Sequence, residues 1–133
     1  MAPAVRAELL AHARDAAPNE CCGLLVGRGN TIELSVRARN LLMSPTRYQI
    51  DPADHFAAIH GARLEGRRVV GAYHSHPATA PVPSETDIAE ASGGSGFLYV
   101  IVSLAEDAIG KEIAAYRLKR GVAEPVELVS AAE

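Results

Sequence analysis

An almost uninterrupted apolar run at residues 97–104, Phe-Leu-Tyr-Val-Ile-Val-Ser-Leu, constrains the fold more strongly than any other feature of this sequence. Aromatic and β-branched side chains favour strands. A strand without alternating polar residues is typically buried on both of its faces. The run therefore predicts a strand inside the domain, with further elements packed on each side of its sheet.

Other segments carry strand and turn signals. Residues 22–26 are apolar and end in the turn residues 27–30, Gly-Arg-Gly-Asn. Residues 31–39 then alternate between apolar and polar side chains, so the two segments predict a β-hairpin. We also expect strands at residues 47–50, 69–73, 112–119 and 126–129.

Helix signals lie between these strands. Apolar residues recur at helical spacing over residues 5–13. Asp51 followed by Pro52 is a strong helix start, and Gly66 is suited to follow the end of that helix. Ser84 begins a third helix. Helices interleaved with strands indicate an α/β or α+β fold, with one mixed β-sheet flanked by helices.

Composition excludes several classes of protein. Of the 133 residues, 48% are hydrophobic and 22% charged, as in ordinary globular domains. The net charge is −3 and no basic run is present, which argues against a nucleic-acid partner. No apolar stretch approaches the ~18–20 residues of a membrane span, so no membrane partner is expected. The N-terminus lacks the basic and apolar regions of a secretion signal.

Cysteine usage and length complete this general description. The two cysteines, Cys21 and Cys22, are adjacent, and a disulfide between neighbours is strained. This is typical of a reduced chain, so we expect a cytoplasmic protein. The length corresponds to about one domain, and the Gly/Ser stretch at residues 92–96 is too short to link two domains. We expect a single domain over residues 1–133, and the sequence leaves its oligomeric state open.

A candidate metal site follows the expected strand at residues 69–73. His74 and His76 are two residues apart, so in an extended backbone both imidazoles point to the same side. Asp87 follows after a Pro-rich loop at residues 77–83. Two imidazoles and a carboxylate with an open fourth position are typical of a catalytic zinc site. A water in that position acquires a pKa near ~7.

Each half of this pattern also has a simpler explanation. An isolated His-x-His sequence is a weak metal signal on its own. The tetrapeptide from Ser84 to Asp87 also matches a capping box, with Ser at the N-cap and an acid three residues later. Taken alone, it favours capping over metal binding.

The whole string carries a family resemblance that its parts do not. His74-Ser-His-Pro followed by Ser84-Glu-Thr-Asp87 resembles the JAMM motif of the MPN+ metalloproteases: His-x-His-Pro, a loop, then Ser-x-x-Asp. That family also has a glutamate upstream of a strand, and Glu20 occupies this position within residues 19–27, Asn-Glu-Cys-Cys-Gly-Leu-Leu-Val-Gly. The resemblance continues through a middle segment found in small bacterial members, at Asn40, Ser44-Pro45, Tyr48 and Asp51-Pro52.

The resemblance covers nearly the whole chain and implies a JAMM/MPN fold, which is related to the cytidine-deaminase fold. The expected order of helices and strands agrees with it. Two deaminase signatures, His-x-Glu and Pro-Cys-x-x-Cys, are missing from the sequence, so deamination is not supported.

The resemblance also implies a role for each site residue. His74, His76 and Asp87 would hold a zinc ion, with water completing the tetrahedron. Glu20 would accept a proton from that water and deliver it to the leaving amine, as general base and then general acid. Ser84 would donate its hydroxyl to the tetrahedral oxyanion.

Other residues with reactive side chains are not given a role in the reaction. Cys22 is expected to pack in the core, and the roles of Cys21 and Ser75 are left open. His12, His55 and His60 lie on expected helices and are interpreted as surface or partly packed groups.

The absence of long insertions around the motif bears on the substrate. Larger relatives of this family are deubiquitinases, whereas small bacterial members resemble peptidases of ubiquitin-like sulfur-carrier proteins. We therefore expect hydrolysis of an amide bond after the Gly-Gly C-terminus of such a carrier, with the tail lying beside Tyr73 and the Pro-rich loop. The alternatives are a general metallopeptidase of cell-wall or phage-tail type, and a non-catalytic MPN scaffold that only binds partners.

Overall fold

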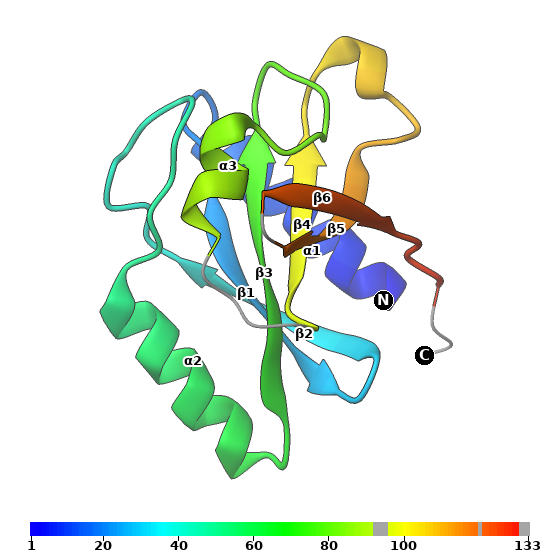
Figure 1. Cartoon of the computed structure of the whole chain (residues 1–133). Coiled ribbons are helices and arrows are strands. Elements are labelled where there is room, and N and C mark those ends of the chain that lie inside the picture. Colours follow the sequence, from blue (N-terminus) through cyan, green and yellow to red (C-terminus); the bar gives the residue numbers. More distant parts are fainter. Residues whose placement is uncertain (92–95, 120, 131–133) are drawn as a thin grey trace.

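A mixed β-sheet forms the centre of the computed structural model, which describes residues 1–91, 96–119 and 121–130. Its strands are β1 (Cys22–Arg28), β2 (Thr31–Ala38), β3 (Arg68–His76), β4 (Leu98–Ser103), β5 (Ile113–Lys119) and β6 (Val122–Val126). They lie in the order β2-β1-β3-β4-β5-β6 (Figure 1). β3 and β4 are parallel, and all other neighbours are antiparallel.

Helices cover both faces of this sheet (Figure 1). α1 (Pro3–Ala16) lies on one face, and α2 (Pro52–Leu64) and α3 (Glu85–Glu90) lie on the other. Leu9 of α1 packs in a buried cluster with Leu25 and Val100. On the opposite face, Ala58 of α2 packs with Leu24. The predicted fold class, a mixed sheet flanked by helices, is confirmed.

The strand predicted from the apolar run is confirmed as β4, near the middle of the sheet. Its residues from Tyr99 to Ser103 are all buried. It pairs in parallel with β3 on one side and antiparallel with β5 on the other. Because β4 is covered on both faces, its sequence has no need of polar alternation.

The predicted hairpin is also confirmed, as β1 and β2. The register shifts between Val26 and Gly27, which marks a β-bulge. A Cβ atom on Gly27 would overlap the carbonyl of Thr31, so only glycine allows the two backbones to approach this closely.

The start and end of α2 follow the sequence signals. The Asp51 side chain accepts a hydrogen bond from the backbone N–H of Ala53 at 2.9 Å, as an N-cap does. After the helix, Gly66 has a φ of +70°, a conformation that glycine adopts without penalty. None of the helices in the described part of the chain is long and apolar enough to cross a membrane.

Three predicted segments differ from the structure. Residues 47–50 form no strand, and only Ile50 makes an isolated bridge, to Asn40. The strand expected at residues 69–73 begins at Arg68 and continues as β3 through His76. The last strand occupies Val122–Val126 rather than residues 126–129, because Gly121 turns the chain back immediately after β5 with a φ of +78°. Of the connector at residues 92–96, only Gly96 lies within the described residues.

Candidate metal centre

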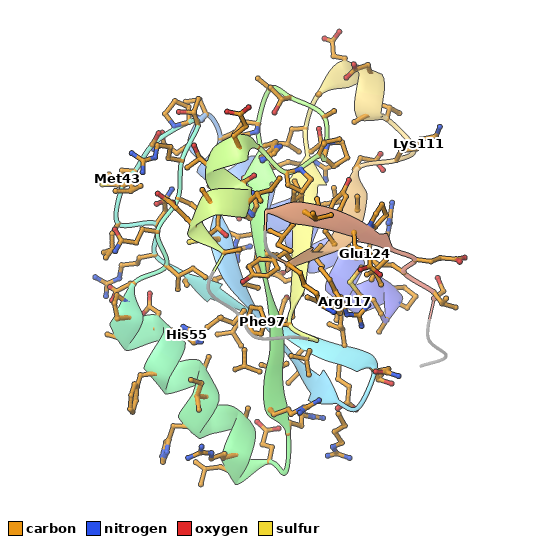
Figure 2. All side chains as sticks on the ribbon, in the orientation of Figure 1. Met43, His55, Phe97, Lys111, Arg117 and Glu124 are labelled. Carbon is orange, nitrogen blue, oxygen red and sulfur yellow. The ribbon has the colours of Figure 1, made fainter. Side chains whose placement is uncertain are left out.

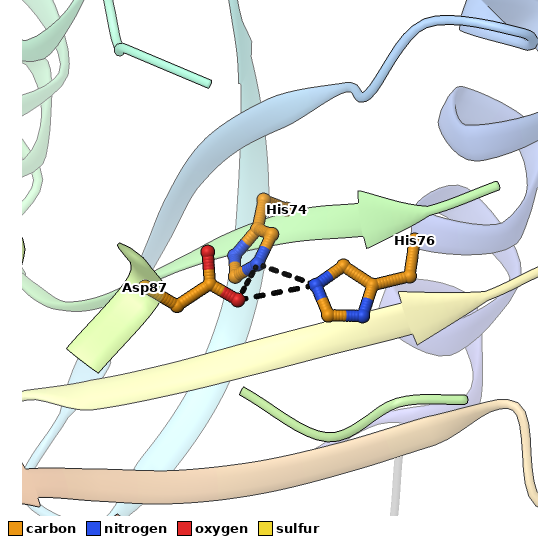
Figure 3. Close-up of side chains that lie close together, drawn as sticks. All are labelled: His74, His76 and Asp87. Atoms are coloured by element: carbon orange, nitrogen blue, oxygen red, sulfur yellow. Dashed lines mark hydrogen bonds and ion pairs between the residues drawn. The ribbon is translucent and has the colours of Figure 1, made fainter. Parts of the chain in front are cut away.

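Three ligand-type side chains converge at the end of β3 (Figure 3). His74 and His76 present their Nε2 atoms to the same side of the strand, 3.2 Å apart. Each Nε2 lies 3.1 Å from Oδ2 of Asp87, which belongs to α3. The two-residue spacing and the helix that follows the Pro-rich loop therefore bring together the three predicted ligands.

Asp87 is held in this position by the local structure at the start of α3. Its Oδ2 accepts a hydrogen bond from the backbone N–H of Ser84 at 2.9 Å. Its own backbone N–H donates to Ser84 Oγ at 3.0 Å, which completes a capping box. The two interpretations of this tetrapeptide are thus compatible, since the cap orients the carboxylate toward the histidines.

His76 is oriented through its second ring nitrogen. Its Nδ1 lies 2.9 Å from the carbonyl oxygen of Ala80, in the loop before α3. A carbonyl can only accept, so Nδ1 carries the proton and donates it. This leaves the lone pair of Nε2 free to coordinate a metal ion, the arrangement usual for histidine ligands.

Burial and charge set the protonation of the three groups. Relative exposures are 2% for His74, 6% for His76 and 8% for Asp87. Burial lowers the pKa of His74, against the opposing effect of Asp87. Burial also acts to lower the pKa of His76, but its bonds to Asp87 and Ala80 outweigh this and raise it. Burial acts to raise the pKa of Asp87, while the two histidines hold it well below its usual range.

Glu20 lies two residues before β1, close enough to His76 and Asp87 to feel their charges, and only 4% of its surface is exposed. Its Oε1 atom is buried without a hydrogen-bond partner among the described residues. Burial raises the pKa of the carboxyl to about 7, with Asp87 adding to the rise and His76 opposing it. A buried carboxylate oxygen without a hydrogen-bond partner destabilises the folded state. Such groups are commonly found at functional sites.

These observations fit a bound cation. Two imidazoles and one carboxylate are a donor set that zinc accepts. A cation held by these groups would also favour the charged form of Glu20, whose pKa already depends on the charges of His76 and Asp87. His74, His76 and Asp87 could therefore hold a metal ion, with Glu20 next to it.

Ser84 is placed where its hydroxyl is available. The residue is exposed, and its Oγ accepts a hydrogen bond from the backbone of Asp87. A hydroxyl that accepts at its oxygen still has its own proton to donate. Its predicted role toward an oxyanion stays a prediction.

The cysteines and Ser75 form part of the support behind the site. Ser75 Oγ accepts a hydrogen bond from the backbone N–H of Cys21 at 2.8 Å, which joins β3 to the residue after Glu20. Burial raises the thiol pKa of Cys21 to about 11 and that of Cys22 to about 12. Neither thiol is therefore suited to act as a nucleophile.

Two expectations about aromatic and histidine residues were wrong. Tyr73 is 1% exposed and packs on the α1 face, so it cannot lie beside a substrate tail. Its hydroxyl lies 2.7 Å from Nδ1 of His12, which is buried, whereas a surface or partly packed position was expected. The reason is the alternation along β3, which sends Tyr73 to the face opposite His74.

The aromatic residue next to the ligands is Tyr48, from the loop between β2 and α2. Its ring stacks on His74, with centroids 4.2 Å apart and planes at 18°. Tyr48 also lines a hollow of about 550 Å³ together with Asp87, Phe97, Tyr99 and Leu24. Figure 2 labels Phe97 in front of β3. The sequence places Tyr48 in an expected strand at residues 47–50 and in a resembling segment, and no local pattern shows that this part of the chain is an irregular loop folded over β3.

Comparisons with known proteins match the chain to a family, to relatives and to a solved structure. The family described as prokaryotic homologs of the JAB domain matches residues 2–119. The desampylase of Haloferax volcanii is 36% identical over 110 residues, covering 77% of this chain and 78% of that protein. The CysO-cysteine peptidase of Mycobacterium tuberculosis is 34% identical over 133 residues, covering 94% and 90%. A solution structure of a protein from Desulfitobacterium hafniense has a TM-score of 0.88 at 35% identity, covering 99% and 92%.

Proposed function

This chain belongs to the prokaryotic JAB-domain family and is a hydrolase of JAMM/MPN+ type, and we propose that it is a zinc-dependent peptidase or isopeptidase. Its substrate is a ubiquitin-like or sulfur-carrier protein, and the bond hydrolysed is the amide directly after the carrier's Gly-Gly C-terminus. The names of the relatives, a desampylase and a CysO-cysteine peptidase, support a substrate of this kind.

One observation carries the proposal. The Nε2 atoms of His74 and His76 meet Oδ2 of Asp87 at 3.1 Å, and a buried carboxyl with a pKa of about 7, Glu20, lies beside them. A partner-binding scaffold has no need of this set, because burying the carboxyl of Glu20 with an oxygen that lacks a partner among the described residues destabilises a fold. A metal-dependent hydrolase uses both a metal site and a base of near-neutral pKa.

The residues divide the reaction between them. When bound, zinc polarises a carbonyl oxygen and lowers the pKa of a coordinated water. Glu20 takes up the proton of the attacking water and delivers it to the nitrogen of the leaving amine. Ser84 donates a hydrogen bond from its hydroxyl to the oxygen that becomes negative in the transition state. The burial of Glu20 keeps its carboxyl basic enough to move a proton near neutral pH.

We further propose that residues 1–133 act as a single domain in the cytoplasm, without a nucleic-acid or membrane partner. The two free, buried cysteines suit a reducing compartment.

The substrate proposal is tested with carriers that differ at one residue. The zinc-loaded protein is incubated with a small carrier joined through Gly-Gly to an adduct, and with the same carrier in which the second-last glycine is valine. Intact mass should show loss of the adduct from the Gly-Gly carrier only. Equal cleavage of both carriers, or rapid cleavage of unrelated unfolded peptides, would indicate a general metallopeptidase instead.

A further inference from the structure

Tyr48 has no role in the proposed reaction, yet its ring contacts the ligand His74 directly. Its ring lies nearly parallel to that of His74, with centroids 4.2 Å apart. We propose that Tyr48 is a positioning residue, whose ring holds the His74 imidazole in the plane that directs Nε2 toward Asp87 and His76. The inference rests on the proposed metal site but is independent of the substrate.

The two histidine ligands are held in different ways. The ring plane of His76 is fixed by the contact of its Nδ1 with Ala80. At His74, the neighbour that fixes the ring is Tyr48, lying flat against it. Rotation of an imidazole about its last side-chain torsion is soft, so a ligand ring needs such a constraint to keep its nitrogen aimed. A stacked aromatic ring supplies it, because turning His74 would break the contact between the two faces.

The backbone on either side of Tyr48 is fixed by the side chain of Asn40. The Asn40 amide donates to the carbonyl oxygens of Glu20 at 3.1 Å and Arg47 at 3.0 Å. Its oxygen accepts from the backbone N–H groups of Leu42 and Gln49, both at 3.0 Å. Asn40 therefore holds the backbone on both sides of Tyr48 and also joins that loop to the proposed base.

Two further contacts hold the same loop against the site. The carbonyl oxygen of Ser44 accepts a hydrogen bond from the backbone N–H of Glu20 at 2.8 Å. The guanidinium of Arg47 pairs with the Glu90 carboxylate of α3 at 2.9 Å. The loop thus contacts the segment before β1, the ligand His74 and the helix that carries Asp87. This arrangement suits an element that positions side chains rather than a free surface loop.

The test measures zinc affinity, which needs no substrate. Tyr48→Phe keeps the ring and removes only the hydroxyl, while Tyr48→Leu and Tyr48→Ala remove the stacked face. Zinc dissociation constants are measured by competition with a chromophoric chelator, after thermal melting has shown that each variant is folded. We expect Tyr48→Phe to match the wild type and Tyr48→Leu and Tyr48→Ala to bind zinc roughly 10- to 100-fold more weakly, as for other residues that orient ligands.

A matched control variant distinguishes loss of the ring stacked on His74 from a change in the shape of the hollow. Phe97 lines the same hollow but has its ring contact with Tyr99, so Phe97→Leu should leave zinc affinity unchanged. With cobalt in place of zinc, Tyr48→Leu should also change the visible absorption that reports ligand geometry, and Tyr48→Phe should not.

The outcomes distinguish this inference from the proposed function. Wild-type zinc affinity in folded Tyr48→Leu or Tyr48→Ala would overturn the positioning role while leaving the metal site intact. An equal loss in Tyr48→Phe would assign the effect to the hydroxyl and overturn the stacking argument. If the wild type binds zinc no better than a His74→Ala, His76→Ala variant, the proposed metal site itself is wrong.

Discussion

Replacing Glu20 by glutamine should stabilise the metal-free protein at neutral and higher pH while it removes the proton acceptor. The wild-type carboxyl is buried, with one oxygen lacking a partner among the described residues. Burial raises its pKa from the ordinary 4.5 to about 7 in the folded protein. The folded state therefore keeps a proton that the unfolded state releases, and stability must fall as pH rises through this interval.

The size of the effect follows from the pKa difference. At about 1.4 kcal/mol per pKa unit, the interval between 4.5 and about 7 corresponds to about 3 kcal/mol once the pH is above 7. Glutamine has nearly the same shape and cannot ionise, so its variant does not bear this cost. The other titrating groups are shared by both proteins and cancel in the comparison.

The assay is urea unfolding of both proteins, freed of metal by a chelator, between about pH 4 and about pH 8. The free energies of unfolding should differ by a constant amount near pH 4, and Glu20→Gln should gain about 3 kcal/mol relative to wild type by pH 8. A difference between the two proteins that stays constant with pH would refute the claim that Glu20 is a buried group with a raised pKa.

Three other changes test separate parts of the account. Ser84→Ala removes both a helix cap and the proposed donor to the oxyanion. The free energy of unfolding in urea should fall by about 1 kcal/mol and kcat should fall by roughly 10²–10³-fold. An unchanged kcat would exclude Ser84 from the mechanism. Cys21 and Cys22 should resist iodoacetamide in the native protein near neutral pH and react in urea, as mass spectrometry can show; rapid native labelling would contradict their burial and raised pKa. Tyr73→Phe leaves the buried His12 without its partner and should cost about 1–3 kcal/mol in the same unfolding assay; no loss would mean that this hydrogen bond is not needed.

Local signals in the sequence predicted the parts of this fold that depend on neighbouring residues. The apolar run that became β4 needs burial on both faces wherever it lies. Asp51 caps α2 through a backbone N–H only two residues away. The convergence of His74 and His76 follows from the alternation of an extended strand, which acts at the same short range.

Contacts between distant segments were not predictable in this way. The stack of Tyr48 on His74 depends on a loop in which the carbonyl of Arg47 and the N–H of Gln49, on either side of Tyr48, hydrogen-bond to the Asn40 side chain rather than to a strand. That side chain also explains why residues 47–50 form no strand. The burial of Tyr73 was within reach of sequence reasoning, since a residue adjacent to His74 in a strand must face the other way.

Measuring zinc content and cleavage in the same two samples separates the metal site from the proposed base. Wild type and Glu20→Gln are each loaded with zinc, analysed for metal, and incubated with a carrier joined through Gly-Gly to an adduct. Both should hold close to one zinc per chain, since Glu20 is not one of the three ligand residues. The wild type should cut only after the second glycine, and the variant should be slower by roughly 10²–10⁴. Wild-type turnover by Glu20→Gln, or cleavage that persists after zinc is removed, would contradict the account.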